Sequence, residues 1–236
     1  MIKKRWGIFL ILFCCFTNLV FAGSTKPVQL AAWSPLQLFS ENDSISGVRL
    51  NLFYTDNQNV SGLTLGAGWN KASGDMKGAS FGMVNWVDEA AYAWKVGILN
   101  YTEDRSVGVD IGLVNIGQGD TTGLQLGAVN WNEGFFHGYQ GGFINYVNGP
   151  FVGSQSGVIN IATDNFSGFQ LGLMNYVGKE MTGFQLGVFN SAAKSTGFQL
   201  GLFNATDSLG GLQIGFSNYN EEGQPMLWML GANWAF

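Results

Sequence analysis

The stretch GFQLGLMN (168–175) occurs again, with few changes, as GFQLGVFN (183–190) and GFQLGLFN (197–204). Every copy closes on an asparagine, and the closing asparagines follow one another at intervals of fifteen residues, or fourteen near the end of the chain. They are Asn70, Asn85, Asn100, Asn115, Asn130, Asn145, Asn160, Asn175, Asn190, Asn204, Asn218 and Asn233. A repeat of fixed period predicts a chain built from one short structural unit used many times.

Residue types alternate within each unit, as MTGFQLGVFNS (181–191) shows. One side of an extended chain would carry Thr182, Phe184, Leu186, Val188 and Asn190. The other side would carry Met181, Gly183, Gln185, Gly187, Phe189 and Ser191. A period of two predicts a β-strand. The two glycines in each block and the many aromatic residues and valines argue against a helix.

Short polar segments such as 88–89 and 178–180 separate the units and contain the residues that turns need. One polar turn per unit favours an antiparallel meander, because a parallel solenoid must turn at least twice in each coil. The sequence therefore predicts an all-β, repeat-built antiparallel β-barrel of about 12–14 short strands. A glycine kink at Gly183 or Gly187 would supply a second turn, so a parallel β-solenoid is the alternative.

The first 22 residues predict a secretory signal peptide. Three cations at positions 3–5 precede an apolar stretch, and Ala22 marks the expected cleavage site. Residues 23–236 are then expected to form a single repeat-built β domain. Both cysteines, Cys14 and Cys15, lie in the signal segment, so the exported chain would contain neither disulfides nor thiolate metal sites.

Composition fits a β protein with much apolar surface, either on two faces or facing lipid, and the last segment favours a membrane environment. Charged residues make up 11% of the chain and aromatic residues 14%, whereas soluble proteins carry about 25% charged residues. The segment MLWMLGANWAF (226–236) alternates and ends in phenylalanine, as terminal strands of outer-membrane barrels do. We expect outer-membrane lipid and the barrel-assembly machinery as partners. The net charge of −5 argues against nucleic acid.

The blocks of the form G-[LF]-Q-[LI]-G-x-x-N, together with the opening AAWSPLQLFS (31–40) and SGVRLNLFYTDNQNVSG (46–62), resemble bacterial surface-repeat-containing proteins. The resemblance covers most of the chain after the signal segment. It implies an exported protein at the outer membrane or cell surface of a diderm bacterium. It supplies no catalytic residues and no ligand.

Few residues suggest chemistry. His137 is the single histidine, and no second histidine or later cysteine accompanies it for a zinc site. The paired carboxylates at 88–89 and 103–104 fit solvated turns, and the pair Gly183/Gly187 has no Gly-Lys-Ser or Gly-Lys-Thr of a phosphate loop. We therefore expect no catalytic residue, no metal site and no cofactor, and the chain is not expected to be an enzyme.

One repeated position holds glutamine seven times and is the candidate functional stripe. Its members are Gln125, Gln140, Gln155, Gln170, Gln185, Gln199 and Gln213. They would line a pore or a glycan-binding strip, or they would bond to one another in a narrow interior. The leading hypothesis is an outer-membrane or cell-surface β-repeat protein with a structural or passive pore-like role. The alternative is an exported β-solenoid adhesin or surface-binding module.

Overall fold

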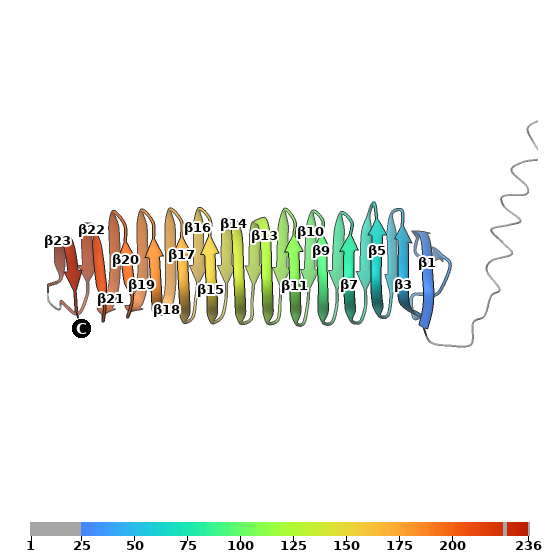
Figure 1. The fold of residues 1–236 in the computed structure, drawn as a ribbon, viewed down its shortest axis with the longest axis horizontal. Helices are drawn as coiled ribbons and strands as arrows, with labels where there is room; N and C mark the ends of the chain where they lie inside the picture. The colour runs from blue at the N-terminus through green and yellow to red at the C-terminus, as the bar shows by residue number, and fades with distance from the viewer. Residues whose placement is uncertain (1–24, 224–225, 236) are drawn as a thin grey trace, which may run out of the picture.

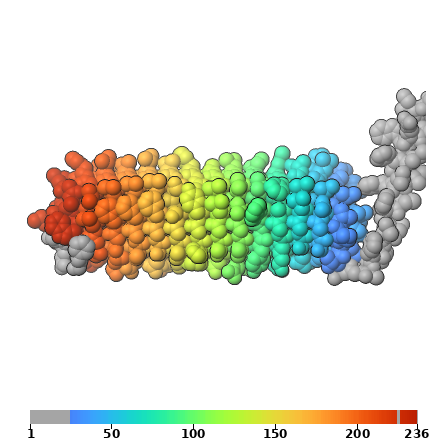
Figure 2. All heavy atoms as spheres, in the orientation of Figure 1, coloured from blue at the N-terminus to red at the C-terminus, as the bar shows by residue number. Residues whose placement is uncertain are grey.

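The structure, a computed structural model, describes residues 25–223 and 226–235. The expected signal peptide and the terminal Phe236 lie outside the described residues. The described chain forms an elongated rod of stacked coils (Figures 1 and 2). Each coil has two flat sides, which we call the first face and the second face, and all 23 strands belong to one continuous sheet.

The first face is made by the strand that opens each coil. It contains β1 (Thr25–Trp33), β3 (Ser44–Asn51), β5 (Val60–Gly66), β7 (Met76–Phe81), β9 (Ala91–Val96), β11 (Ser106–Ile111), the first parts of β13 (Thr121–Asn132) and β14 (Phe136–Val147), β15 (Phe151–Ser156), β17 (Phe166–Leu171), the last part of β18 (Met174–Leu186), β20 (Phe198–Leu200) and the first part of β22 (Leu212–Asn220).

The second face is made by the strands that follow them. It contains β4 (Tyr54–Asn57), β6 (Trp69–Ala72), β8 (Val84–Val87), β10 (Leu99–Thr102), β12 (Val114–Gly117), the last parts of β13 and β14, β16 (Ile159–Ala162), the first part of β18, β19 (Phe189–Ser195), β21 (Phe203–Leu209) and the end of β22. The short β2 (Leu36–Gln37) pairs with β1 at one end, and β23 (Trp228–Trp234) pairs with β22 at the other.

Neighbouring coils pair in parallel and in strict register. Asn160 lies beside Asn175, and Asn175 beside Asn190, so one sequence repeat is one coil. Among the described strands, only the end pairs β1–β2 and β22–β23 are antiparallel. The predicted antiparallel β-barrel is therefore wrong, and the alternative, a parallel β-solenoid, describes the fold. The coarser prediction of an all-β, repeat-built chain is confirmed.

The second turn of each coil, which the count of polar segments missed, is an apolar bend. In the coil that joins β18 to β19 the chain reverses at Gly187-Val188. A Cβ atom on Gly187 would lie 2.4 Å from the carbonyl oxygen of Gly172 in the preceding coil, so only glycine fits there. We call the side of the rod with these bends the bend edge, and the side with the polar segments the turn edge.

The bend also changes which side chains point inward. Gln185 and Asn190 are both buried, although five positions separate them, because the bend between them shifts the alternation by one residue. The predicted grouping of Asn190 with Phe184 and Leu186 on one side is wrong for this reason. Phe184 and Leu186 do lie on the outer surface, and Phe189 lies there too.

Apolar packing inside the rod is concentrated near the turn edge. Phe136, Phe151 and Phe166 stack with ring centroids 5.1 and 5.0 Å apart. They share a cluster with buried residues of the second face, including Val147, Ala162 and Val177, while a similar cluster forms around Met76 and Val87 nearer the N-terminus. The rest of the interior is polar. No helix that would be long and apolar enough to cross a membrane occurs in the described residues.

Candidate functional surface

The repeated asparagines form a ladder inside the bend edge. The Asn160 Nδ2 group donates one hydrogen bond to Asn175 Oδ1 at 2.8 Å and another to the backbone oxygen of Leu171 at 2.9 Å. Leu171 immediately precedes the bend at Gly172 in the next coil, and the same pair of bonds occurs at each repeated asparagine from Asn70 to Asn204. The asparagine therefore ties each bend to its neighbour and satisfies its own buried amide.

The seven predicted stripe residues lie in the interior, at the centre of the coils, where they are at most 1% exposed. Gln170 Nε2 donates to Gln155 Oε1 at 2.8 Å, and Gln185 Nε2 donates to Gln170 Oε1 at 2.7 Å. Gln185 Nε2 also lies 3.3 Å from the Ser191 oxygen on the opposite face. The stripe is thus a chain of amides bonded to one another and across the coil.

The same central position is occupied by different residues in the N-terminal coils. In register they are Arg49, Thr64, Ser80, Lys95 and Asp110, followed by Gln125. All five are buried. The sequence analysis missed them because it followed residue identity. Counting back from Gln125 by one repeat reaches Asp110 and by two repeats reaches Lys95, and this spacing was the signal that could have found them.

These substituted positions pair with one another. Lys95 Nζ lies 3.2 Å from Asp110 Oδ1 and also donates to the Thr102 hydroxyl. Arg49 Nε donates to Thr64 Oγ1 at 3.2 Å. Burial lowers the pKa of Arg49 to about 10, against the opposing effect of Asp56. The charges are enclosed within the rod, so we assign them to the fold and not to a site for ligands.

The remaining residues that the sequence singled out lie on the outside. His137 is exposed on β14, with its ring centroid 6.4 Å from that of Phe135. The segments 88–89 and 103–104 lie at the turn edge, where Asp88 accepts a bond from Trp86 and pairs with Lys71. The described residues contain no group of three or more histidine, cysteine, aspartate or glutamate side chains that would hold a metal ion.

The outer surface of the rod is largely apolar, and the bend edge is its most exposed part. Seven of the side chains at the bends are more than half exposed: Met83, Ile98, Leu113, Phe143, Leu173, Leu202 and Phe216. Large apolar side chains continue onto the first face, including Trp94 and Leu171, and onto the second face, including Met174 and Phe189. Away from the apolar clusters near the turn edge, polar side chains line the interior, so in this part of the rod the polarity of an ordinary globular domain is reversed.

Aromatic residues with polar atoms separate this apolar surface from the turn edge on the second face. We call Trp86, Tyr101, Trp131, Tyr146, Tyr176 and Tyr219 the aromatic belt. Trp86 stacks on Tyr101 and Trp131 on Tyr146, with centroids 3.8 and 3.9 Å apart. The indole N–H groups of Trp86 and Trp131 donate to Asp88 and Glu133 at the turn edge. The rings therefore bridge an apolar zone and a charged one.

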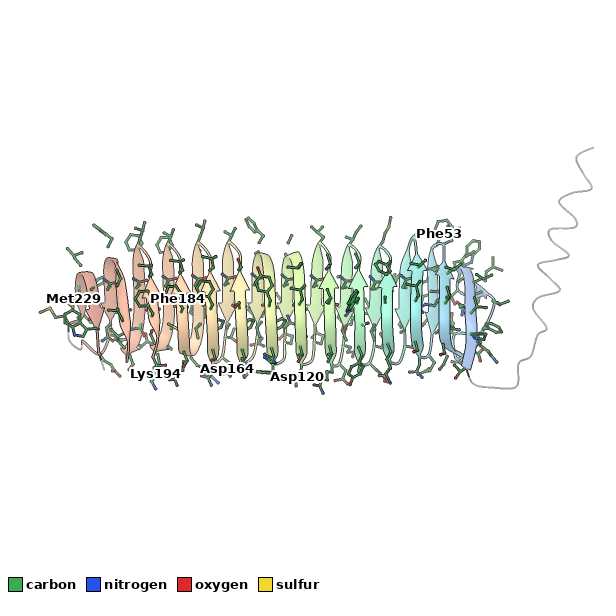
Figure 3. All side chains as sticks on the ribbon, viewed as in Figure 1. Phe53, Asp120, Asp164, Phe184, Lys194 and Met229 are labelled. Atoms are coloured by element: carbon green, nitrogen blue, oxygen red, sulfur yellow. The ribbon has the colours of Figure 1, made fainter. Side chains whose placement is uncertain are left out.

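Charges gather at the turn edge. Figure 3 shows Asp120, Asp164 and Lys194 along one side of the rod, with Phe53 on the opposite side. Lys179 pairs with Asp164 at 2.6 Å and Lys194 with Glu180 at 3.2 Å. The hydrogen bond from Lys179 holds the pKa of Asp164 below its ordinary value.

A shallow groove of about 410 Å³ interrupts the aromatic belt. Its floor contains Ser191 and Ala205, where neighbouring coils have tyrosine, and Tyr176, Tyr219 and Trp228 stand around it. The groove is a local feature of the same apolar surface.

A scan against protein-family models and searches of curated proteins and of solved structures found no match to this chain.

Proposed function

We propose that this chain is an exported, non-catalytic β-solenoid that acts as a surface-binding or structural module of a bacterial envelope. The observation that supports it is the reversed polarity of the rod: amides and charges are enclosed, and a continuous apolar surface is displayed. Such a surface needs a partner or a non-aqueous environment, because exposed apolar patches larger than a few hundred Å² mark interaction sites.

The repetition of the surface supports a binding or structural role over a reaction centre. Catalytic sites bring several unlike groups together, whereas each outward column here repeats similar side chains along the rod. The pore-like role depended on the antiparallel barrel and is not retained. Location at the outer membrane or cell surface, the signal peptide, and membership of the surface-repeat family remain predictions from the sequence.

Export is tested by producing the full chain with a C-terminal tag in a diderm bacterial host. We expect cleavage after Ala22, measured by mass spectrometry, and degradation by protease added to intact cells. A chain lacking residues 2–22 is the control and should stay unprocessed and protected. An uncleaved, protected full-length chain would refute the proposal, provided that a known surface protein is degraded in the same cells.

A further inference from the structure

We propose that the partner of this surface is a lipid bilayer, and that the rod lies in one leaflet with its axis parallel to the membrane plane. The bend edge would point into the hydrocarbon and the turn edge into water. This inference rests on the surface-binding role proposed above and names its partner.

The first argument is the distribution of charge around the rod. Between residues 79 and 216, no Asp, Glu, Lys, Arg or His side chain points outward at the bends. None points outward from the parts of the two faces that lie next to the bends either. Lys95 and Asp110 fall within this span but are enclosed. A zone free of charge complements hydrocarbon, in which an exposed charge is costly.

The second argument is the order of residue types across the second face. In one coil, Leu173 lies at the bend and Met174 begins the second face, Tyr176 belongs to the aromatic belt, and Lys179 and Glu180 lie at the turn edge. Aliphatic, then amphipathic aromatic, then charged residues follow one another across a membrane–water interface in the same way. Tyr176 follows Leu173 by three positions, or about 10 Å of strand. That depth fits within one leaflet, since half the hydrocarbon thickness is about 15 Å.

The third argument concerns the backbone at the bends, because polar backbone groups immersed in lipid must be paired. Gly172 donates to the Leu186 oxygen at 3.0 Å, and both Leu173 and Met174 donate to the Val158 oxygen at 3.0 Å. The next coil repeats the pattern, with Val188 and Phe189 donating to Leu173. Asn160 adds its bond to Leu171 from inside. The backbone N–H groups of these bends are thus all paired, which lowers the cost of placing the bend edge in hydrocarbon.

The shape of the apolar surface favours lipid over a second copy of the chain. Twelve central positions from Arg49 to Gln213 give a rod about 50 Å long at about 4.8 Å per coil. At about 10 Å of strand on each face beside the bends, the apolar band is about 20 Å wide and covers on the order of 1,000 Å², which exceeds the roughly 800 Å² that each partner contributes to a standard interface. The band wraps around an edge, however, so a flat partner would cover one face only. Lipid chains surround both faces and the edge together.

Vesicle flotation with the purified mature chain tests this directly. The protein is transferred from mild detergent into phosphatidylcholine vesicles, and we expect it to float with them. Because the turn edge is acidic, vesicles that contain an anionic lipid should bind it no better. The pair Leu113→Arg/Leu173→Arg should lower the bound fraction at least about tenfold, since each arginine would enter hydrocarbon.

The matched control places the same two charges at the turn edge, as Gln58→Arg/Gln118→Arg. Both glutamines are exposed, and binding should not change. Circular dichroism establishes that all variants keep the β fold. Equal loss of binding in both pairs, or binding that requires anionic lipid, would overturn the proposal.

An environment-sensitive fluorophore gives a second measurement on the otherwise cysteine-free mature chain. Attached at Leu113→Cys, it should shift to the blue on adding vesicles, and attached at Gln118→Cys it should not. A blue shift at position 113 that appears without lipid, in a species of twice the mass, would identify a second copy as the occupant and overturn the lipid proposal. None of these outcomes depends on export in a cell, so they are separate from the test of the proposed function.

Discussion

The N-terminal and C-terminal coils of the rod have the same asparagine ladder, but they differ in the column of buried side chains at the centre of the coils, which we call the central column. The asparagine ladder inside the bend edge runs with the same bonds through both parts, from Asn85 to Asn218. The central column changes at Gln125. Seven glutamines, the first of them Gln125, run toward the C-terminus, whereas arginine, threonine, serine, lysine and aspartate precede them.

The difference teaches which constraint is strict. Each asparagine must bond both to the backbone oxygen before a bend and to the asparagine of the next coil. Few other side chains have the length and the amide group to make both bonds. The central column needs only that donors meet acceptors. A row of identical glutamines achieves this because every amide has both, while unlike residues must be matched in pairs, as Lys95 and Asp110 are.

The largest effect is expected from leaving a buried charge alone in the N-terminal coils. Lys95→Gln removes the partner of Asp110, which is 3% exposed, and should lower the free energy of unfolding by about 3–5 kcal/mol. The double variant Lys95→Gln/Asp110→Gln extends the glutamine ladder and should recover most or all of that loss. Chemical denaturation measures both. A double variant as unstable as the single one would show that glutamines cannot replace the pair of Lys95 and Asp110 at these central positions.

Arg49 offers a comparison that depends on pH. Its pKa in the folded chain, about 10, lies below the ordinary value of arginine, so above about pH 10 the unfolded state binds more protons and stability rises with pH. Relative to Arg49→Gln, the unmodified chain should gain stability as the pH rises through that value, by about 1.4 kcal/mol for each pH unit. Denaturation at several pH values checks this, and a constant difference would contradict the burial of the charged group.

Breaking the glutamine ladder should cost less. Gln170→Leu leaves Gln155 Oε1 and Gln185 Nε2 without their bonds to position 170, and we expect a loss of about 1–3 kcal/mol. Ser167→Ala, exposed on the same strand, is the control and should have little effect. Thermal unfolding compares the two, and equal stability would mean that the amides re-pair with other groups.

The smallest effect belongs to the exposed pair of Lys179 and Asp164 in the C-terminal coils. The pKa of Asp164 is lowered by the bond from Lys179, so its contribution is present above pH 3.8 and is lost as pH falls through the lowered pKa. Solvent screens such pairs, and Asp164→Asn should barely change the melting temperature at neutral pH. A loss comparable with that of Lys95→Gln would remove the distinction between enclosed and exposed pairs.

Much of the fold was predictable from residues 181–191. The fifteen-residue period, the β structure and the outward positions of Phe184 and Leu186 all follow from the pattern. The glutamine stripe was predicted as a set of equivalent residues. The sequence left open whether these residues line a pore or binding strip or bond to one another in the interior. Burial of Gln170 and its bonds to both neighbours place the set in a ladder.

The sequence by itself determined that one β unit is repeated and that its apolar side chains line up in columns, because period and alternation are local properties of the chain. Only the tertiary structure decided that the columns stack in parallel. The reason is the bend at Gly187-Val188, which has no polar turn residue to mark it in the sequence. Whether the chain continues as a strand or reverses at Gly187 depends on the carbonyl of Gly172 and the amide of Asn175 in the preceding coil. These contacts exist only after the coils have stacked.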